Sequence, residues 1–262
     1  MSEPLITYEL EGNIALIGLN RPDKRNAIND PLVDELRAAV LRAHEEADVA
    51  VLFGHGSNFC AGLDLAEALA RATGQIKAAR KRKRHNWHEV FDLIARGPIP
   101  FVAALHGAVV GGGLELAMAA HVRVCDDTAL FGLPEGQRGI FVGGGGTVRI
   151  QRVVGTTVMM DMMLTGRLLS AVEGLQEKVI RYVTPAGEAL AKAKELAHRI
   201  SKNSVETNWM IVNVLPRIHD MTHNDGLFVE QLNSARARPP EAEARLREFV
   251  DGKAKKLQDN QA

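Results

Sequence analysis

Three short apolar segments constrain the fold of this chain more than any other feature. They cover residues 49–54, 99–105 and 122–125, and Arg123 is the one charged residue among them. Continuous apolar runs of this length are typical of strands that are buried on both faces. A segment with helical periodicity, residues 30–46, precedes the first of them, and a further helix is expected to open at about residue 114, between the second and the third. The order of these segments predicts an α/β fold with a mostly parallel sheet covered by helices.

The N-terminal segment predicts a β-hairpin that leads into the first helix. Two short β-rich runs, Ile6–Leu10 and Ile14–Leu19, flank the turn residues Glu11-Gly12-Asn13. A helix is expected to start with Asp30 as its N-cap and Pro31 at its first position, because both residue types are favoured there.

The pattern becomes mainly helical after about residue 155. Amphipathic stretches cover residues 187–201, 204–215 and 240–257. We therefore expect a core of residues 1–195 and a helical C-terminal assembly region of residues 196–262. Such a helical arm is expected to pack on the core or on a neighbouring subunit.

Composition excludes several classes of protein. The 262 residues include 32 Lys and Arg and 32 Asp and Glu, so the formal net charge is zero, which argues against a dedicated nucleic-acid binder. Two cysteines, Cys60 and Cys125, are too few for a secreted disulfide scaffold and are expected to be reduced, buried thiols. The chain has no apolar run long enough to span a membrane and no signal-peptide pattern, so a cytoplasmic protein without a membrane partner is expected.

The glycines are concentrated in two windows of the chain. Fourteen of the 24 lie within residues 54–62 and 107–146. Each window follows a predicted strand, where glycine lets the backbone approach a ligand closely or adopt a positive φ. Two such loops at one edge of a sheet could direct free N–H groups at a single oxygen atom.

Two glutamates lie near these loops. Glu115 has apolar neighbours from Leu114 to Ala120, so its charge is expected to be buried, which costs free energy unless the group is paired or functional. Glu135 follows Pro134 and precedes a glycine-rich stretch. Its setting fits a carboxylate at a helix start as well as a catalytic group.

Five segments together resemble the crotonase, or enoyl-CoA hydratase/isomerase, superfamily. They occur in the order and with the spacing of that family over about residues 5–185. The segments are Asn20-Arg21-Pro22…Asn26-Ala27-Ile28, Phe59-Cys60-Ala61-Gly62-Leu63-Asp64-Leu65, His106-Gly107…Gly111-Gly112-Gly113-Leu114-Glu115-Leu116-Ala117, Phe131…Pro134-Glu135 and Leu164-Thr165-Gly166-Arg167.

The resemblance implies a crotonase-like spiral of ββα units with a helical C-terminal trimerisation part, assembled as a homotrimer or a homohexamer (a dimer of trimers). It implies an acyl-CoA thioester substrate, usually of fatty acid metabolism, and an enolate held by the backbone N–H groups of Leu63 and Gly112. The motif positions of Glu115 and Glu135 match the two glutamates of the hydratases, in which the first deprotonates the attacking water and the second manages the proton at C2. The resemblance therefore favours an enoyl-CoA hydratase.

The resemblance also assigns a coenzyme A path. Coenzyme A is part of the substrate, so no separate cofactor and no metal are expected. Phe249 and Lys253 correspond to residues that a neighbouring subunit contributes, although Gly252 occupies the family's expected lysine spacing. The other residues of the path are Lys24, Arg25, Ala27, Ala61, Gly62, Asp64 and Leu65.

Several features leave alternatives open. The family's usual Asn and Asp are replaced by His106 and His121, which could be structural or catalytic. The run Lys77–Arg84 holds six basic residues, which fit a solvated face, a surface for the CoA phosphates or an RNA patch. Trp87 and Phe91 could shape the acyl pocket or belong to the core. The alternatives are an aryl (hydroxycinnamoyl-type) CoA hydratase-lyase, an enoyl-CoA isomerase, or a non-catalytic relative that binds a CoA thioester or RNA.

Overall fold

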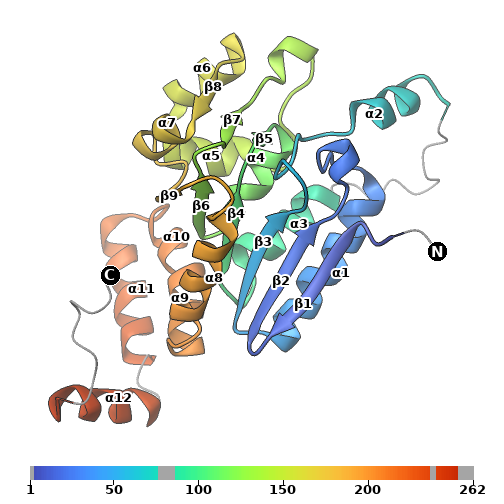
Figure 1. Ribbon diagram of the computed structural model, residues 1–262. Coiled ribbons are helices and arrows are strands. Elements are labelled where there is room, and N and C mark those ends of the chain that lie inside the picture. Colours follow the sequence, from blue (N-terminus) through green and yellow to red (C-terminus); the bar gives the residue numbers. More distant parts are fainter. Residues whose placement is uncertain (1–2, 76–85, 237–239, 253–262) are drawn as a thin grey trace. The chain divides into compact units, whose positions relative to one another are not determined.

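The computed structural model describes residues 3–75, 86–236 and 240–252 and divides the chain into two compact units (Figure 1). The first unit covers residues 1–201 and the second residues 202–262. The division predicted at residue 195 falls inside helix α8, Ala189–Ile200. Ala193 and Ala197 of this helix are fully buried in a cluster with strand residues of the first unit, so the whole helix belongs to that unit.

A six-stranded sheet forms the centre of the first unit. Its strand order is β1-β2-β3-β4-β6-β9. The strands are β1 Ile6–Glu11, β2 Ile14–Leu19, β3 Val49–Gly54, β4 Phe101–Leu105, β6 Val122–Asp126 and β9 Tyr182–Thr184. The β1–β2 pair is antiparallel, and each of the other neighbouring pairs is parallel. The predicted hairpin and the mostly parallel sheet are confirmed.

Both faces of this sheet are covered, which explains the continuous apolar runs. Successive side chains of a strand point to opposite faces. Ile17 belongs to the cluster that includes residues of α1 (Asp30–Glu46) and α3 (Asn86–Arg96), whereas Leu16 packs in the cluster of α8. A strand between two layers of helices therefore needs apolar side chains at every position.

The start of α1 differs from the prediction. Asn29 is the N-cap, because its backbone is extended at φ −125° and its side-chain oxygen accepts a hydrogen bond of 3.1 Å from the N–H of Leu32. Asp30 and Pro31 are the first two helical residues. The prediction of Asp30 as the N-cap was wrong by one position, since Asn and Asp are about equally good caps and the sequence offers both in succession.

A smaller second layer lies beside the sheet. It contains a three-stranded sheet in the order β5-β7-β8, and β5 and β7 lie within the glycine-rich window of residues 107–146. The remaining elements of the first unit are η1 Pro22–Lys24, α2 Leu65–Ala72, β5 Ala108–Val110, α4 Gly112–Ala117, β7 Leu130–Gly132, η2 Gly136–Arg138, α5 Gly146–Val154, α6 Thr156–Thr165, β8 Leu168–Ser170 and α7 Ala171–Gln176. The described chain after residue 155 is mainly helical, as predicted, and the strands β8 and β9 are exceptions that the sequence did not indicate. Each has three residues, too few for a detectable period of two.

The second unit is helical where it is described. Its helices are α9 Val205–Asn213, α10 Leu215–Ile218, α11 His223–Arg236 and α12 Pro240–Val250. The predicted stretch of residues 240–257 continues beyond residue 252, outside the described residues.

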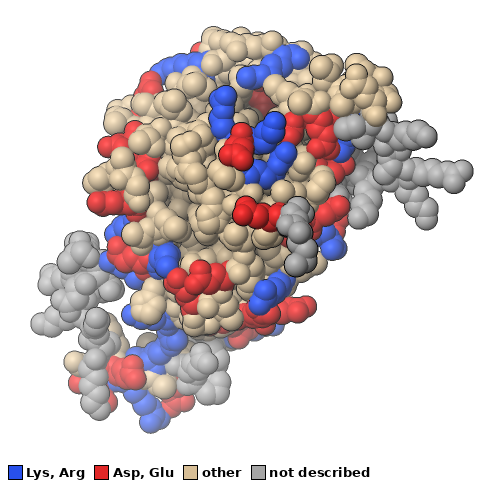
Figure 2. All heavy atoms as spheres, turned by 45° about the vertical axis from the view of Figure 1, so that its right-hand side comes forward, with Lys and Arg blue, Asp and Glu red and all other residues tan. Residues whose placement is uncertain are grey.

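No helix in the described parts of either unit is long and apolar enough to cross a membrane. On the face in Figure 2, basic and acidic side chains are interspersed, as the net charge of zero suggests.

Candidate active site

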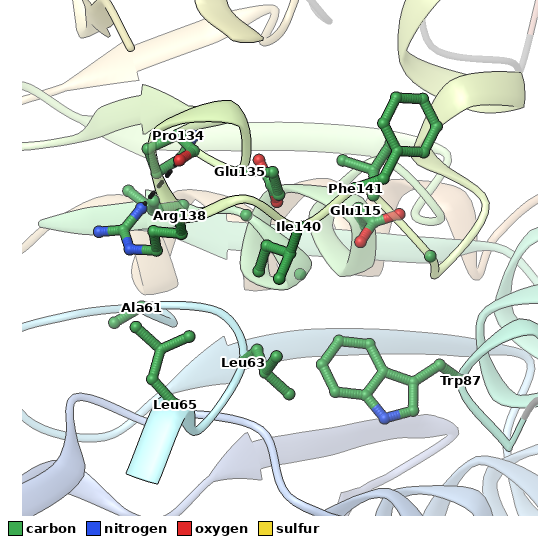
Figure 3. A pocket seen from close by; sticks show the side chains of 15 residues that line it. Ala61, Leu63, Leu65, Trp87, Glu115, Pro134, Glu135, Arg138, Ile140 and Phe141 are labelled. Atoms are coloured by element: carbon green, nitrogen blue, oxygen red, sulfur yellow. Dashed lines mark hydrogen bonds between the residues drawn. The ribbon is translucent and has the colours of Figure 1, made fainter. Parts of the chain in front are cut away.

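The two glycine-rich segments and the loop after β7 enclose a pocket of about 240 Å³ (Figure 3), which we call the main pocket. It brings together Leu63, Gly112, Glu115 and Glu135, the four residues predicted to be catalytic. The complete lining is Ala61, Leu63, Leu65, Trp87, Val110, Gly111, Gly112, Glu115, Pro134, Glu135, Arg138, Ile140, Phe141, Val142 and Gly143.

The loop that ends at Leu63 can reach the main pocket because residue 62 is glycine. Gly62 has a φ of +89°, which disfavours every residue with a side chain. A Cβ atom there would lie 2.6 Å from the carbonyl oxygen of Val110 and 3.2 Å from the nitrogen of Gly112. The two segments therefore meet backbone to backbone, as the glycine pattern predicts.

The N–H groups of Leu63 and Gly112 are available to a ligand. The backbone of Ile28 pairs with this segment: its N–H donates to the carbonyl of Gly62, and its carbonyl accepts from the N–H of Asp64. The N–H of Leu63, which lies between Gly62 and Asp64, takes no part in this pairing. Gly112 is the first residue of α4, where backbone N–H groups lack a partner within the helix. Within the described residues, neither N–H group has an acceptor.

Glu115 is held in a fixed position by the glycine-rich loop of residues 143–146. Its side chain lies on α4, and the residue is 2% exposed. The Oε1 atom accepts hydrogen bonds from the N–H groups of Gly144, at 2.7 Å, and Gly146, at 2.8 Å. Among the described residues no donor bonds the other carboxylate oxygen, Oε2, which leaves it for a molecule in the pocket.

Glu135 lies in a different environment from Glu115. It is 6% exposed, and its Oε2 atom is buried without a hydrogen-bond partner in the described structure. Burial raises the pKa of the Glu135 carboxyl above its usual value, and the negative charge of Glu115 raises it further. Two carboxyls whose surroundings differ in this way can divide the roles of acid and base.

The main pocket has two unlike ends. Figure 3 shows Trp87 and Glu115 toward one end, with Arg138 toward the same end as Ala61 and Leu65. The Nη1 group of Arg138 donates to the carbonyl of Pro134 at 3.2 Å.

The sequence left open whether Trp87 shapes the pocket or belongs to the core, and in the structure it lines the pocket. Arg138 was missed, since no motif marks it and only its distance of three residues from Glu135 could have suggested it.

Comparison with known proteins decides the family. A family model described as enoyl-CoA hydratase/isomerase matches residues 9–237. The chain belongs to the enoyl-CoA hydratase/isomerase family.

Relatives and solved structures support this assignment along nearly the whole chain. The chain is 32% identical over 225 residues to an Arabidopsis thaliana protein named probable enoyl-CoA hydratase 2, mitochondrial, with 85% of this chain and 73% of that protein covered. It is 30% identical to a probable enoyl-CoA hydratase of Mycobacterium bovis, with 97% and 98% covered. A crystal structure from Rhodopseudomonas palustris CGA009 is 41% identical, covers 97% of each chain and superposes with a TM-score of 0.87. The predicted crotonase-like α/β fold is thereby confirmed.

The residues that the family resemblance assigned to coenzyme A lie in different places. Ala61 and Leu65 line the main pocket, and Gly62 shapes it. Lys24, Arg25 and Ala27 are not among the residues that line it. The turn that contains them is joined to the pocket wall, because the N–H of Ala61 donates to the carbonyl of Arg25 at 2.9 Å.

The Asp64 carboxylate is engaged within the protein. It caps α2 by accepting from the N–H of Glu67 at 3.2 Å, and it forms an ion pair of 3.1 Å with Arg21. Phe249 lies on α12 of the second unit and is 64% exposed, and Lys253 lies outside the described residues, as does the basic run Lys77–Arg84.

Both candidate histidines are bonded to the backbone and lie outside the lining of the main pocket. The Nε2 atom of His106 lies 3.0 Å from the carbonyl oxygen of Gly56. The Nδ1 atom of His121 accepts from the N–H of Phe101 at 2.9 Å, and burial lowers the pKa of this histidine to about 4. These contacts support structural roles for both side chains.

The two cysteines are free and buried, as predicted. Burial raises the pKa of the Cys60 thiol to about 12 and that of the Cys125 thiol to about 12. Both thiols are therefore protonated and unreactive near neutral pH.

A second pocket of about 250 Å³ shares two of its lining residues, Leu63 and Trp87, with the main pocket. We call it the side pocket. Its complete lining is Ile28, Asn29, Asp30, Leu63, Asp64, Glu67, Ala68, Arg71 and Trp87.

Proposed function

We propose that this protein is an enoyl-CoA hydratase, which adds water across the C2=C3 bond of a 2-enoyl-CoA thioester. The observation that carries the proposal is the meeting of two buried glutamates, Glu115 and Glu135, with the free N–H groups of Leu63 and Gly112 around one pocket. Membership of the enoyl-CoA hydratase/isomerase family supports an acyl-CoA thioester as the substrate.

The amide groups of Leu63 and Gly112 stabilise the negative charge that develops on the thioester oxygen. Attack at C3 moves the C2=C3 electron pair toward the thioester and forms an enolate. Preorganised backbone donors in a site sheltered from water favour that charge, and the loss of one such donor typically costs about 2.7–4 kcal/mol of transition-state stabilisation.

The two glutamates carry the protons. The Glu115 carboxylate takes a proton from water as the water oxygen bonds to C3, and the hydrogen bonds from Gly144 and Gly146 keep this carboxylate oriented. Glu135, whose pKa is raised by burial, then gives a proton to C2 as the enolate collapses to the thioester. The product gains one hydroxyl at C3 and one hydrogen at C2, and proton exchange with solvent resets both carboxyls.

The substrate brings coenzyme A with it, so the proposed reaction uses no separate cofactor. Addition of water to a conjugated thioester is neither an oxidation nor a reduction of the substrate as a whole, and the base and acid are side chains of the protein. The proposed CoA path comprises Lys24, Arg25, Ala27, Ala61, Gly62, Asp64 and Leu65, with Phe249 and Lys253 contributed by a neighbouring subunit.

The proposed assembly is a homotrimer or a dimer of trimers. The helices of the second unit expose large apolar side chains, among them Leu232, which is 55% exposed, and Phe228, which is 62% exposed. Apolar surface of this kind marks protein interfaces. Light scattering coupled to size-exclusion chromatography tests the proposal, and a monomer at micromolar concentration would contradict it.

The deciding experiment incubates the purified protein with crotonyl-CoA and with cinnamoyl-CoA and follows the loss of the enoyl-thioester absorbance. We expect turnover to a 3-hydroxyacyl-CoA, identified by mass as the substrate plus one water. Conversion of a 3-enoyl-CoA to a 2-enoyl-CoA without uptake of water would instead identify an isomerase, and release of a shorter acyl-CoA would identify a lyase. Isomerisation without uptake of water would overturn the proposal, and so would cleavage to a shorter acyl-CoA and an aldehyde in place of a 3-hydroxyacyl-CoA product.

A further inference from the structure

The direction of the Leu63 N–H depends on the pairing of its loop with Ile28. The N–H of Ile28 donates to the carbonyl of Gly62 at 2.7 Å, and the N–H of Asp64 donates to the carbonyl of Ile28 at 2.9 Å. The N–H of Leu63 lies between these two bonds, so its direction follows the position of Ile28 relative to the loop. The proposed donor to the thioester oxygen therefore depends on a contact between two segments that are distant in the sequence.

One guanidinium group joins these two segments. The Nη1 group of Arg21 donates to the carbonyl of Ala27, and its Nη2 group bonds the Asp64 carboxylate at 3.1 Å. Ala27 directly precedes Ile28. Asp64 directly follows Leu63, which forms an isolated parallel β-bridge with Ile28. The guanidinium thus spans the residues beside this bridge, and its rigid, planar set of donors suits that task.

Arg21 is itself held by a buried side chain. Its backbone N–H donates to Oδ1 of Asn26 at 2.8 Å, and Asn26 is fully buried. The Nδ2 group of Asn26 donates in turn to the carbonyls of His55 and Asn58, at 2.9 and 2.8 Å. The guanidinium therefore extends from a backbone that is fixed in place.

The Asp64 carboxylate connects Arg21 to the start of α2. Its Oδ2 atom bonds Arg21, and its Oδ1 atom accepts from the N–H of Glu67 at 3.2 Å as the N-cap of the helix. No residue of α2 is buried, so the packing of this helix does little to fix the loop before it. The polar contacts of Asp64 therefore hold this end of the loop.

The ion pair of Arg21 with Asp64 is better shielded from water than the other ion pair that anchors α2. The two side chains are 15% and 14% exposed, whereas those of Arg71 and Asp30 are 39% and 54% exposed. Water and salt weaken a shielded pair much less than an exposed one. The shielded pair is therefore the one suited to hold a fixed geometry.

Both side chains of this pair act on the protein. Each oxygen of the Asp64 carboxylate already has a donor, and a carboxylate repels the phosphates of coenzyme A. The Arg21 guanidinium bonds Ala27 and Asp64. These contacts limit the part of Asp64 in the proposed CoA path to its backbone.

We propose that Arg21 and Asp64 are positioning residues, whose ion pair fixes the direction of the Leu63 N–H and so strengthens its hydrogen bond to the thioester oxygen. The inference rests on the proposed function, because it takes that oxygen to be the acceptor. Loss of the pair should weaken the polarisation of a bound thioester without weakening the binding of coenzyme A itself.

Three variants separate the ion pair from the helix cap. Arg21→Met removes the guanidinium, and Asp64→Ser keeps a favoured N-cap residue but is too short to reach Arg21. We expect kcat for crotonyl-CoA to fall about tenfold or more in each, because a small displacement of a catalytic donor is costly. Asp64→Asn keeps the cap and an acceptor for Arg21, so its loss of kcat should be smaller. Asp64→Ser remains as the test if Arg21→Met fails to fold.

The absorbance of bound cinnamoyl-CoA reports the polarisation directly. Hydrogen bonds to the carbonyl of a conjugated thioester draw electrons toward its oxygen and move the absorbance to longer wavelength. Glu115→Gln, which is expected to bind without turnover, serves as the background for this measurement. Arg21→Met and Asp64→Ser should each reduce the red shift, whereas a merely structural role would not change it in the bound protein. A full red shift in both variants would overturn the inference.

A double variant and a matched control test whether the pair acts as a unit. Arg21→Met combined with Asp64→Ser should lose no more kcat than either change alone, because both remove the same contact. Losses that multiply would overturn the inference. Arg71→Gln breaks the exposed ion pair of α2 and should keep both kcat and the red shift. A loss equal to that of Arg21→Met would point to general loosening of α2 and would also overturn it.

Calorimetry with free coenzyme A distinguishes positioning from ligand contact. We expect Arg21→Met and Asp64→Ser to bind free coenzyme A as the wild type does. A loss of affinity that matches the loss of kcat would assign these side chains to the ligand and overturn the inference.

The outcome for this inference is separable from the outcome for the proposed function. If the wild type hydrates crotonyl-CoA and both variants keep their kcat and red shift, the positioning role is refuted while the hydratase stands. If no enoyl-CoA is hydrated, but bound cinnamoyl-CoA is red-shifted and Arg21→Met reduces that shift, the positioning role stands and the proposed reaction is refuted.

Discussion

The carboxylate of Glu115 accepts a hydrogen bond of 2.7 Å from the backbone N–H of Gly144, which lies 29 positions later in the chain. The N–H of Gly146 donates to the same oxygen at 2.8 Å. A Cβ atom on Gly146 would lie 2.9 Å from that oxygen, so glycine is needed for this approach. The buried carboxylate thus depends on a loop that the glycine-rich sequence makes possible.

Replacement of either glutamate should abolish most of the activity. We expect Glu115→Gln and Glu135→Gln each to lower the turnover of crotonyl-CoA at least about a hundredfold, because each removes one proton-transfer group. The affinity for a saturated acyl-CoA should change little, since the amide is nearly isosteric with the carboxyl. Rate assays and calorimetry check the two parts, and full activity in either variant would refute the assigned roles.

Arg149 is expected to support the orientation of the Glu115 carboxylate through the loop that contains Gly144. Its Nη2 group donates to the carbonyl of Gly144, and its Nη1 group bonds Asp92 at 2.8 Å. Arg149→Met should lower kcat about tenfold or more with little change in acyl-CoA affinity, because the donors to Glu115 lose their support.

Arg149→Lys should recover part of the lost kcat, because a lysine can still donate to the loop carbonyl. Asp92→Asn is the matched control: it weakens the partly exposed ion pair and should have a smaller effect. Equal losses of kcat in Arg149→Met and Asp92→Asn would contradict a role that acts through the loop.

The pH dependence of hydration should report Glu135. Burial raises its pKa, the charge of Glu115 raises it further, and the charge of Arg138 lowers it. A proton donor is lost as the pH rises through its pKa, so kcat should fall at alkaline pH. Arg138→Gln removes the charge that lowers the pKa of Glu135, so this fall in kcat should occur at higher pH. Arg138→Lys keeps the charge, so the fall should occur near the same pH as in the wild type. A fall in kcat that moves to lower pH in Arg138→Gln would exclude Glu135 as the donor.

Gly113→Ala should destabilise the fold. A Cβ atom there would lie 2.3 Å from the carbonyl oxygen of Cys60, a backbone atom that cannot move aside without shifting the paired segment. We expect a loss of about 1–3 kcal/mol in the free energy of unfolding, measured by denaturant titration. At Gly143 a Cβ atom meets nothing within 4 Å, so Gly143→Ala should change stability by less than about 0.5 kcal/mol. Similar losses in both variants would refute the steric explanation.

His121 should make stability sensitive to acid. Burial lowers its pKa in the folded chain from 6.5 to about 4, so between these values the unfolded chain binds more protons. Stability is therefore fully present above pH 6.5 and decreases as the pH falls toward 4, by up to about 3 kcal/mol. His121→Asn, which keeps an acceptor for the N–H of Phe101, should show a smaller loss of stability between pH 7 and pH 4.5 than the wild type. An equal loss in both proteins would show that another group is responsible.

The sequence by itself determined the N-terminal hairpin, the three strands buried on both faces, the burial of Glu115 and the places where the backbone approaches closely. These properties depend on near neighbours. A continuous apolar run predicts a strand buried on both faces, an apolar helix segment predicts that its one charge is buried, and a glycine after a strand permits a positive φ. The family motifs added Leu63, Gly112 and Glu135 to the predicted catalytic residues, and the fold brings these three to one pocket with Glu115.

Only the tertiary structure decided which distant residues complete the site. Arg138 at one end of the main pocket, Trp87 between the two pockets and Arg149 behind the loop of Gly144 belong to no shared sequence pattern. The ion pair of Asp64 with Arg21 joins residues 43 positions apart. Such contacts depend on strand order and on the paths of loops, whereas periodicity records only the face of an element that is buried.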